Sequence, residues 1–219
     1  MADQLYFEWP TGVALGPDDF FVSEANAHAY AMLSMPDTWP ERKLVLTGPK
    51  GCGKSHLARI FQTQTGSVTV QAAALPADFQ TDASTVIVED MEHLPVGSEE
   101  AMFHLHNYLR NAGGLLLMTS QTAPSRWPVV LPDLASRMQA TTIAQITDPD
   151  DPLLQALIMK LFADRQIMPP PTLAAYLAPR IERSFAAAAD IVARLDAAAL
   201  AEQRKINAAL AARLLDKAD

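Results

Sequence analysis

The chain of 219 residues has one cysteine, no long apolar run and no cluster of basic residues. The single cysteine, Cys52, cannot form an internal disulfide, which fits a reducing compartment. No stretch approaches the ~20 apolar residues of a membrane-spanning helix and no signal peptide opens the chain, so we expect a cytoplasmic protein without membrane contacts. The net charge of −8, with no run of Lys or Arg, argues against a surface that neutralises many DNA phosphates. We therefore expect no direct sequence-specific DNA binding.

The five histidines also lack the spacing that is typical of metal ligands. His104 and His106 lie two residues apart on a predicted helix and therefore face different ways. The sequence shows no Ser-His-Asp or Cys-His pattern for nucleophilic catalysis. We expect neither a histidine metal centre nor a catalytic triad.

What the chain does contain is a phosphate-binding loop at residues 48–55, which matches the pattern G-x-x-x-x-G-K-[ST]. The apolar run 43–47 before the loop predicts a buried strand, and apolar residues at helical spacing follow it. Strand, loop and helix in this order are the context that the motif needs, so a glycine turn with a stray lysine is a poor alternative. The sequence therefore predicts that the protein binds a nucleoside phosphate.

Each residue type in the loop suits this chemistry. Glycines allow backbone N–H groups to surround phosphate oxygens at a positive helix N-terminus. Lys54 would reach the β- and γ-phosphates, and the Ser55 hydroxyl would ligate Mg²⁺. Cys52 is either a small tolerated side chain, the favoured interpretation, or a redox switch. The predicted nucleotide-binding residues of this segment are Gly48, Gly51, Gly53, Lys54, Ser55 and His56.

Apolar segments separated by helical periods predict an α/β fold with a doubly wound, five-stranded parallel sheet. The expected strands lie at 43–47, 68–70, 85–88, 115–118 and 142–146. From about residue 151 the chain is rich in alanine and leucine and has no strand candidates, which predicts a small helical bundle. We expect a flexible N-terminal peptide at 1–12, a nucleotide-binding domain at 13–150 and a helical lid domain at 151–219.

Polar residues follow two of these strands. Glu89 and Asp90 end the strand at 85–88, where carboxylates would hold Mg²⁺ (Glu89 with Ser55) and orient an attacking water. A solvated acidic strand end is the alternative. Glu89 is one methylene longer than the usual aspartate, so we expect slow intrinsic hydrolysis. Gln121, together with Thr119 and Ser120, ends the next strand on the edge where open α/β sheets bind ligands, and one of these residues is a candidate γ-phosphate sensor.

In combination, these features resemble the AAA+ module of the DnaA family of replication initiators, and within it the shorter regulatory-inactivator branch. The resemblance covers most of the chain and is carried by Phe20-Phe21-Val22 with Asn26, the loop 48–55, Glu89-Asp90, Thr119-Ser120-Gln121 with Pro124, and 131–137. The last of these, Leu-Pro-Asp-Leu-Ala-Ser-Arg, is the most specific to the branch. The resemblance implies a AAA+ domain with a helical bundle after it.

The resemblance also assigns residues that the chemistry of the loop did not. It implies that Val22 and Asn26 lie against the adenine and that Arg137 is an arginine finger. Composition alone would make Arg137 a solvated arginine that interacts with the helix dipole.

It further implies an N-terminal peptide that binds the sliding clamp, with Gln4, Leu5 and Phe7 as candidates in a degenerate version of that motif. Gln4 would occupy a polar pocket while Leu5 and Phe7 fill an apolar groove. An apolar segment folded onto the domain is the alternative.

Two departures from the family matter. The initiators carry a C-terminal helix-turn-helix domain that binds origin DNA, and since this sequence ends at Asp219 we expect no such domain. Where the family has an arginine that contacts the nucleotide from the helical domain, this chain has Ala187, with Arg180 and Arg183 nearby. Together with Glu89, this favours a protein that holds ADP and hydrolyses ATP weakly.

The leading hypothesis is a regulator of chromosomal replication initiation that promotes ATP hydrolysis by the initiator DnaA through Arg137, in association with the DNA polymerase sliding clamp. The alternatives are an autonomous ATPase, DnaA-like or helicase-loader-like, and a nucleotide-stabilised adaptor without catalytic effect. A homodimer is a further expectation, by analogy with other AAA+ modules.

Overall fold

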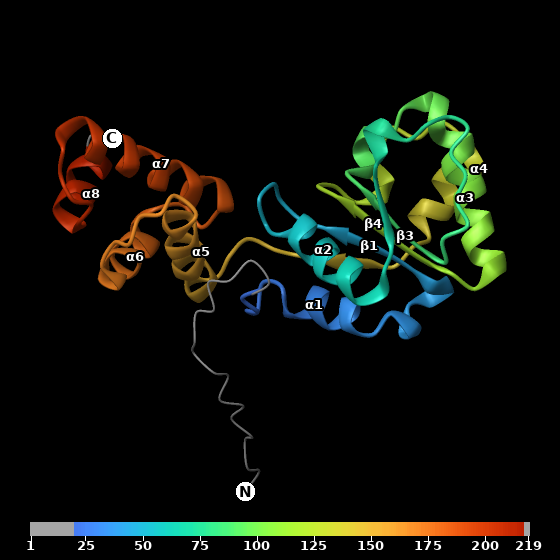
Figure 1. The fold of residues 1–219 in the computed structure, drawn as a ribbon, viewed down its shortest axis with the longest axis horizontal. Helices are drawn as coiled ribbons and strands as arrows, with labels where there is room; N and C mark the ends of the chain where they lie inside the picture. The colour runs from blue at the N-terminus through green and yellow to red at the C-terminus, as the bar shows by residue number, and fades with distance from the viewer. Residues whose placement is uncertain (1–19, 217–219) are drawn as a thin grey trace, which may run out of the picture.

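The computed structural model describes residues 20–216, which form an α/β domain and a helical domain beside it (Figure 1). The strands are β1 (Lys43–Thr47), β2 (Val68–Gln71), β3 (Thr85–Glu89), β4 (Leu115–Ser120) and β5 (Ile143–Gln145). The α-helices are α1 (Ala27–Ser34), α2 (Lys54–Thr65), α3 (Glu99–Ala112), α4 (Pro132–Gln139), α5 (Asp151–Ala163), α6 (Pro171–Leu177), α7 (Phe185–Glu202) and α8 (Ala208–Leu215). The candidate clamp-binding residues Gln4, Leu5 and Phe7 lie outside the described part of the chain.

The five strands form one parallel sheet in the order β2-β3-β4-β1-β5. Every residue of β1, β3 and β4 is buried, because these strands lie inside the sheet with helices over both faces. The edge strands β2 and β5 are shorter and partly exposed. The predicted doubly wound, five-stranded α/β fold is confirmed.

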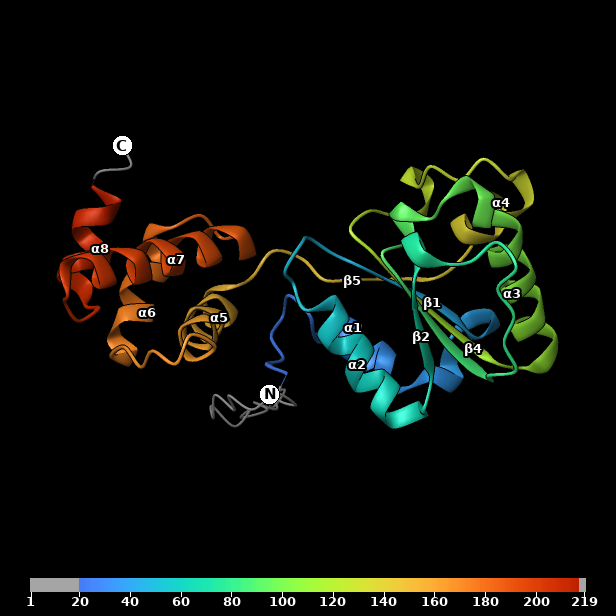
Figure 2. The same cartoon turned by 45° about the horizontal axis from the view of Figure 1, so that its top comes forward.

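Two layers of helices cover the sheet (Figure 2). Helices α1 and α2 pack on one face, where Leu44 and Leu46 of β1 point. Helices α3 and α4 pack on the other face, against Val45 of β1 and Val88 of β3. Because successive strand residues point to opposite faces, alternate residues of one strand enter different cores. Because all five strands are parallel, the loops at their carboxyl ends lie along one edge of the sheet.

Helices α5 to α8 have a core of their own, centred on Leu154, Phe162 and Leu195. Two side chains of this domain, Leu153 at the start of α5 and Phe185 at the start of α7, belong instead to the core of the α/β domain. The helical domain is therefore joined to the α/β domain through the first turns of α5 and α7. No helix within residues 20–216 is long and apolar enough to cross a membrane.

Candidate nucleotide-binding site

The glycine-rich loop connects β1 to α2 at the carboxyl edge of the sheet. Gly51 and Gly53 have φ angles of 82° and 95°, in the left-handed region that favours glycine. At Gly48 the constraint is space, because a Cβ there would lie 2.8 Å from both the Ile146 carbonyl oxygen and Cys52 Sγ. All three predicted glycines are thus needed for the path of the backbone.

Lys54 begins α2 and folds back over the loop. Its buried ammonium donates hydrogen bonds to the carbonyl oxygens of Gly48, at 2.8 Å, and Pro49, at 3.0 Å. Ser55 and His56 follow in the first turn of the helix. The N-cap residue of this helix is Gly53, which has no side chain to cap the first turn, and the N-terminus of a helix favours an anion.

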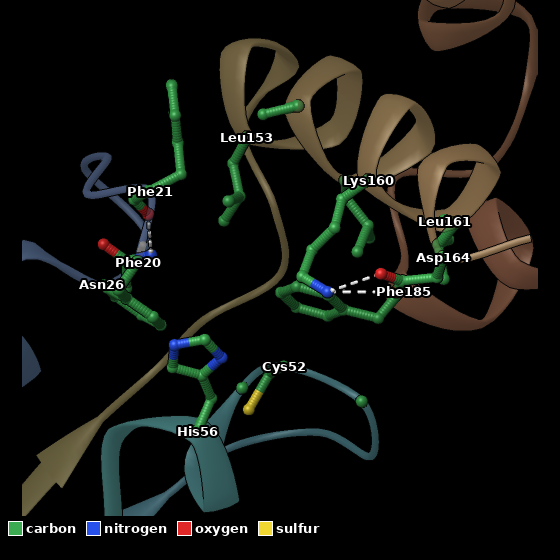
Figure 3. Close-up of a pocket in the computed structure, with 14 residues that line it drawn as sticks. Phe20, Phe21, Asn26, Cys52, His56, Leu153, Lys160, Leu161, Asp164 and Phe185 are labelled. Atoms are coloured by element: carbon green, nitrogen blue, oxygen red, sulfur yellow. Dashed lines mark hydrogen bonds and ion pairs between the residues drawn. The ribbon is translucent and has the colours of Figure 1, made fainter. Parts of the chain in front are cut away.

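A pocket of about 240 Å³ lies between this loop and the helical domain (Figure 3). The residues that line it are Phe20, Phe21, Asn26, Gly51, Cys52, Gly53, His56, Leu153, Ala156, Leu157, Lys160, Leu161, Asp164 and Phe185. The Phe20 ring lies 5.8 Å from the His56 ring, and a Cβ at Gly51 would lie 3.6 Å from Phe185 Cβ. An apolar chamber beside a phosphate-binding loop suits a nucleoside.

The segment before α1 supplies one wall of the pocket, although its residues differ in their placement. Asn26 lines the pocket, and its side chain accepts from the Ser23 N–H at 2.8 Å and donates to the Phe21 carbonyl at 2.9 Å. Val22, the other predicted adenine contact, is half-buried and is not among the described residues that line the pocket. Phe20 and Phe21 line it instead.

The acidic end of β3 offers a site for a cation. Glu89 Oε2 accepts a hydrogen bond from Gln71 Nε2 at 2.8 Å, whereas Oε1 is buried and has no hydrogen-bond partner among the described residues. A cation or a water would satisfy this oxygen. Within residues 20–216 no group of three His, Cys, Asp or Glu side chains could hold a metal alone. The arrangement therefore fits Mg²⁺, which keeps several waters and binds phosphate oxygens.

Asp90 and Glu92 follow β3, and each forms a hydrogen bond with a residue at the end of β4. Asp90 has a φ of 57°, unusual for a residue other than glycine, and its N–H donates to Thr119 Oγ1 at 3.1 Å. Glu92 Oε1 accepts from the Gln121 N–H at 2.9 Å. Burial raises the pKa of Glu92, but hydrogen bonds from Ser120 and Gln121 outweigh it and bring the pKa below its usual value. Sequence reasoning missed Glu92, which holds the candidate sensor Gln121.

Arg137 lies on α4, on the sheet face opposite α2 (Figure 2). Its NH1 donates to Asn107 Oδ1 at 2.5 Å, and its guanidinium lies 4.7 Å from the centre of the Phe103 ring. The described residues that line the nucleotide pocket do not include Arg137. The structure thus keeps this arginine apart from the phosphate-binding loop of its own chain.

The two arginines near Ala187 are engaged elsewhere. Arg183 forms an ion pair with Asp151 at 3.0 Å, and Arg180 lies 4.0 Å from the centre of the Tyr176 ring. The described lining residues include neither arginine.

Cys52 is buried within the loop. Burial raises the pKa of its thiol, which keeps it protonated and disfavours the redox-switch hypothesis.

No protein-family model matches the chain. The chain is 24% identical over 221 residues to the chromosomal replication initiator protein DnaA of Cutibacterium acnes, which covers 89% of this chain and 44% of that protein. The chain therefore spans less than half the length of this relative.

The fold is similar to domain III of the DnaA protein of Thermotoga maritima, with a TM-score of 0.74, 18% identity and coverage of 93% of this chain and 96% of that one. It is also similar to a DnaA initiator bound to AMPPCP and single-stranded DNA, with a TM-score of 0.67, 15% identity and coverage of 82% and 64%. The chain is therefore similar to DnaA in sequence and has the fold of DnaA domain III.

Proposed function

We propose that the chain, which is similar to DnaA in sequence and fold, is a nucleotide-binding regulator of the regulatory-inactivator branch, which promotes ATP hydrolysis by the initiator DnaA while associated with the sliding clamp. The observation that carries the proposal is the position of Arg137, on the sheet face away from the nucleotide pocket of its own chain. An arginine in that position is suited to the nucleotide of a neighbouring molecule.

The pocket of this chain serves as a structural nucleotide site. The first turn of α2 and Lys54 bind the phosphates, and the apolar wall with Phe20, Phe21 and Asn26 holds the nucleoside. Ser55 and Glu89 would hold Mg²⁺, which neutralises phosphate charge when it is bound. Since Glu89 is held by Gln71, we expect weak hydrolysis and ADP as the resident nucleotide.

Arg137 acts on the ATP of the initiator. Its guanidinium places positive charge beside the γ-phosphate, a contribution of ~10³–10⁵ in rate for arginine fingers in general. Asn107 and Phe103 on α3 restrict its orientation before the partner arrives. The start of α4 is fixed as well, since Glu99 accepts hydrogen bonds from the N–H groups of Val130 and Leu131.

The sliding clamp would bind an extended peptide that contains Gln4, Leu5 and Phe7, in the anchoring mode expected from the sequence. This tail would bring the regulator to initiator molecules near the replicating DNA. The low sequence pI of about 5.0 supports a protein partner over direct contact with DNA.

An autonomous ATPase is the second candidate, and the hydrogen bond between Glu92 and the Gln121 N–H favours it, because an acidic residue there holds the backbone of the candidate sensor at the carboxyl edge of the sheet. If this candidate is right, the chain alone hydrolyses ATP, and the substitutions Asp90→Asn and Glu92→Gln abolish this hydrolysis.

The deciding experiment measures ATP hydrolysis by purified DnaA with DNA-loaded clamp, with and without this protein. We expect stimulation by the intact chain, and loss of stimulation in Arg137→Ala and in a chain that lacks residues 1–9. Arg110→Ala is the matched control, because Arg110 is an exposed arginine at the end of α3. Stimulation that survives Arg137→Ala would contradict the finger, and no stimulation by the intact chain would leave an adaptor or an ATPase.

A further inference from the structure

The helical domain places an ion pair in the wall of the nucleotide pocket. Among the described lining residues, the lysine and carboxylate side chains are Lys160 and Asp164, both on α5. Lys160 Nζ lies 2.9 Å and 3.1 Å from the two carboxylate oxygens of Asp164. The wall around the pair is apolar and includes Leu157, Leu161 and Phe185.

Lys160 extends from α5 toward the phosphate-binding loop. In Figure 3 its side chain lies beside Phe185, on the side of the pocket where Cys52 marks the loop. Lys54 is not among the described residues that line this pocket, because its ammonium is turned to the carbonyl oxygens of Gly48 and Pro49. A ligand that fills this pocket therefore contacts the loop at Gly51 to Gly53 and has Lys160 of the helical domain within its surroundings.

The ion pair with Asp164 is easily exchanged. The two side chains are 40% and 55% exposed, and a solvent-exposed pair at i and i+4 contributes little to stability. A lysine has a flexible four-carbon stem and three donors that rotate freely. A phosphate chain carries more negative charge than one carboxylate and would compete successfully for the ammonium.

We propose that Lys160 binds the phosphate chain of the nucleotide, exchanging Asp164 for it, so that the helical domain takes part in phosphate recognition through α5. The inference rests on the proposed nucleotide binding and adds a residue to it. It also gives the pocket a cation from the helical domain, although Arg180 and Arg183 point elsewhere and Ala187 has no charge.

The test is calorimetric titration of the full-length protein with ADP and, separately, with adenosine. We expect Lys160→Gln to weaken ADP binding about tenfold, the loss of one charge-assisted hydrogen bond, and to leave adenosine binding unchanged. Lys160→Arg keeps a cation and should retain most of the affinity. Asp164→Asn removes the competing carboxylate and should tighten ADP binding. Lys205→Gln, an exposed lysine of the same domain, controls for the change in net charge.

The possible results distinguish the role of Lys160 from nucleotide binding itself. If the intact protein binds ADP and Lys160→Gln binds it equally well, or loses ADP and adenosine to the same extent, the role of Lys160 is overturned while nucleotide binding stands. If the intact protein binds no ADP, both are overturned. Neither result depends on DnaA or on the clamp, so the regulatory proposal is tested separately.

Discussion

The Nζ atom of Lys43 lies 2.5 Å from Nε2 of His106, a contact that joins β1 to α3. His106 is 1% exposed, and Arg137 NH1 lies 3.4 Å from its other ring nitrogen. Burial, together with the charges of Lys43 and Arg137, lowers the pKa of His106 to about 4, because the hydrogen bond with Asn107 and the charge of Glu41 raise it by less. The imidazole is therefore neutral in the folded protein near pH 7, which makes it an acceptor for Lys43.

The neutral imidazole predicts a pH dependence of stability. In the unfolded chain His106 takes up a proton near pH 6.5, but in the folded protein only near pH 4. Between these values the unfolded state binds more protons, so the free energy of unfolding falls as pH is lowered, by up to about 3 kcal/mol from this group. His106→Gln keeps an acceptor but does not titrate, and should lose less stability on acidification.

Urea denaturation at intervals from pH 7 to pH 4 measures this effect. The exposed His28→Gln serves as the control and should follow the wild type. A His106→Gln variant whose stability falls as steeply as that of the wild type would show that His106 is not the group responsible.

Lys54 should be required for nucleotide binding. With ADP at a hundred times its dissociation constant, the intact protein gains about 2.7 kcal/mol, which corresponds to a melting-temperature increase of roughly 5–10 °C. Lys54→Met should lose this increase. Lys50→Met removes an exposed lysine from the same loop and should retain most of it. Equal responses of the two variants to ADP would count against a specific role for Lys54.

The phosphate-binding loop could be predicted because all of its determinants lie within a dozen consecutive residues. The glycines fix the backbone, the strand before them is buried on both faces, and α2 begins directly afterwards. The walls of the pocket could not be predicted in this way. Phe20 and Leu157 are 137 positions apart in the sequence, and only the packing of α5 beside the loop brings them to one cavity.

Buried carboxylates show the same limit. From the sequence, an acidic residue at the start of a helix such as Glu99 indicates only a favourable interaction with the helix dipole, but its carboxylate binds the backbone of residues 130–131. Ser98 is the N-cap residue of α3, yet its hydroxyl donates to the Leu75 carbonyl oxygen instead of capping the helix. Helical propensity predicts where α3 begins, whereas these partners lie more than twenty residues away and depend on the tertiary fold.

Arg137 and Asn107 should be energetically coupled. The 2.5 Å hydrogen bond and the Phe103 ring hold the guanidinium, so Arg137→Ala and Asn107→Ala should each cost about 1 kcal/mol in the free energy of unfolding. The double variant should lose about 1 kcal/mol less than the sum of the two. Arg137→Lys should lower the free energy of unfolding about as much as Arg137→Ala, because lysine lacks the planar guanidinium group.

Chemical denaturation of the four proteins measures this coupling. Arg137→Ala combined with Arg180→Ala, which lies in the helical domain, should be additive and serves as the control. Additivity in the Arg137 and Asn107 pair as well would contradict a preorganised guanidinium.

Two buried glutamates should respond oppositely to the same substitution. Glu89 Oε1 is buried without a hydrogen-bond partner among the described residues, so Glu89→Gln removes poorly compensated charge and should raise the free energy of unfolding by about 1 kcal/mol. Glu99 is 3% exposed and accepts from two backbone N–H groups, so Glu99→Gln should cost about 1.5–3 kcal/mol. Chemical denaturation without nucleotide or Mg²⁺ measures the change in the free energy of unfolding of both variants.

Destabilisation of similar size in the two variants would mean that the Glu89 carboxylate has enough hydrogen-bond partners in the folded protein, and the argument for a cation beside it would fail. Stabilisation by Glu89→Gln, accompanied by loss of any ATP hydrolysis, would instead indicate that the charge is kept for function at a cost to stability.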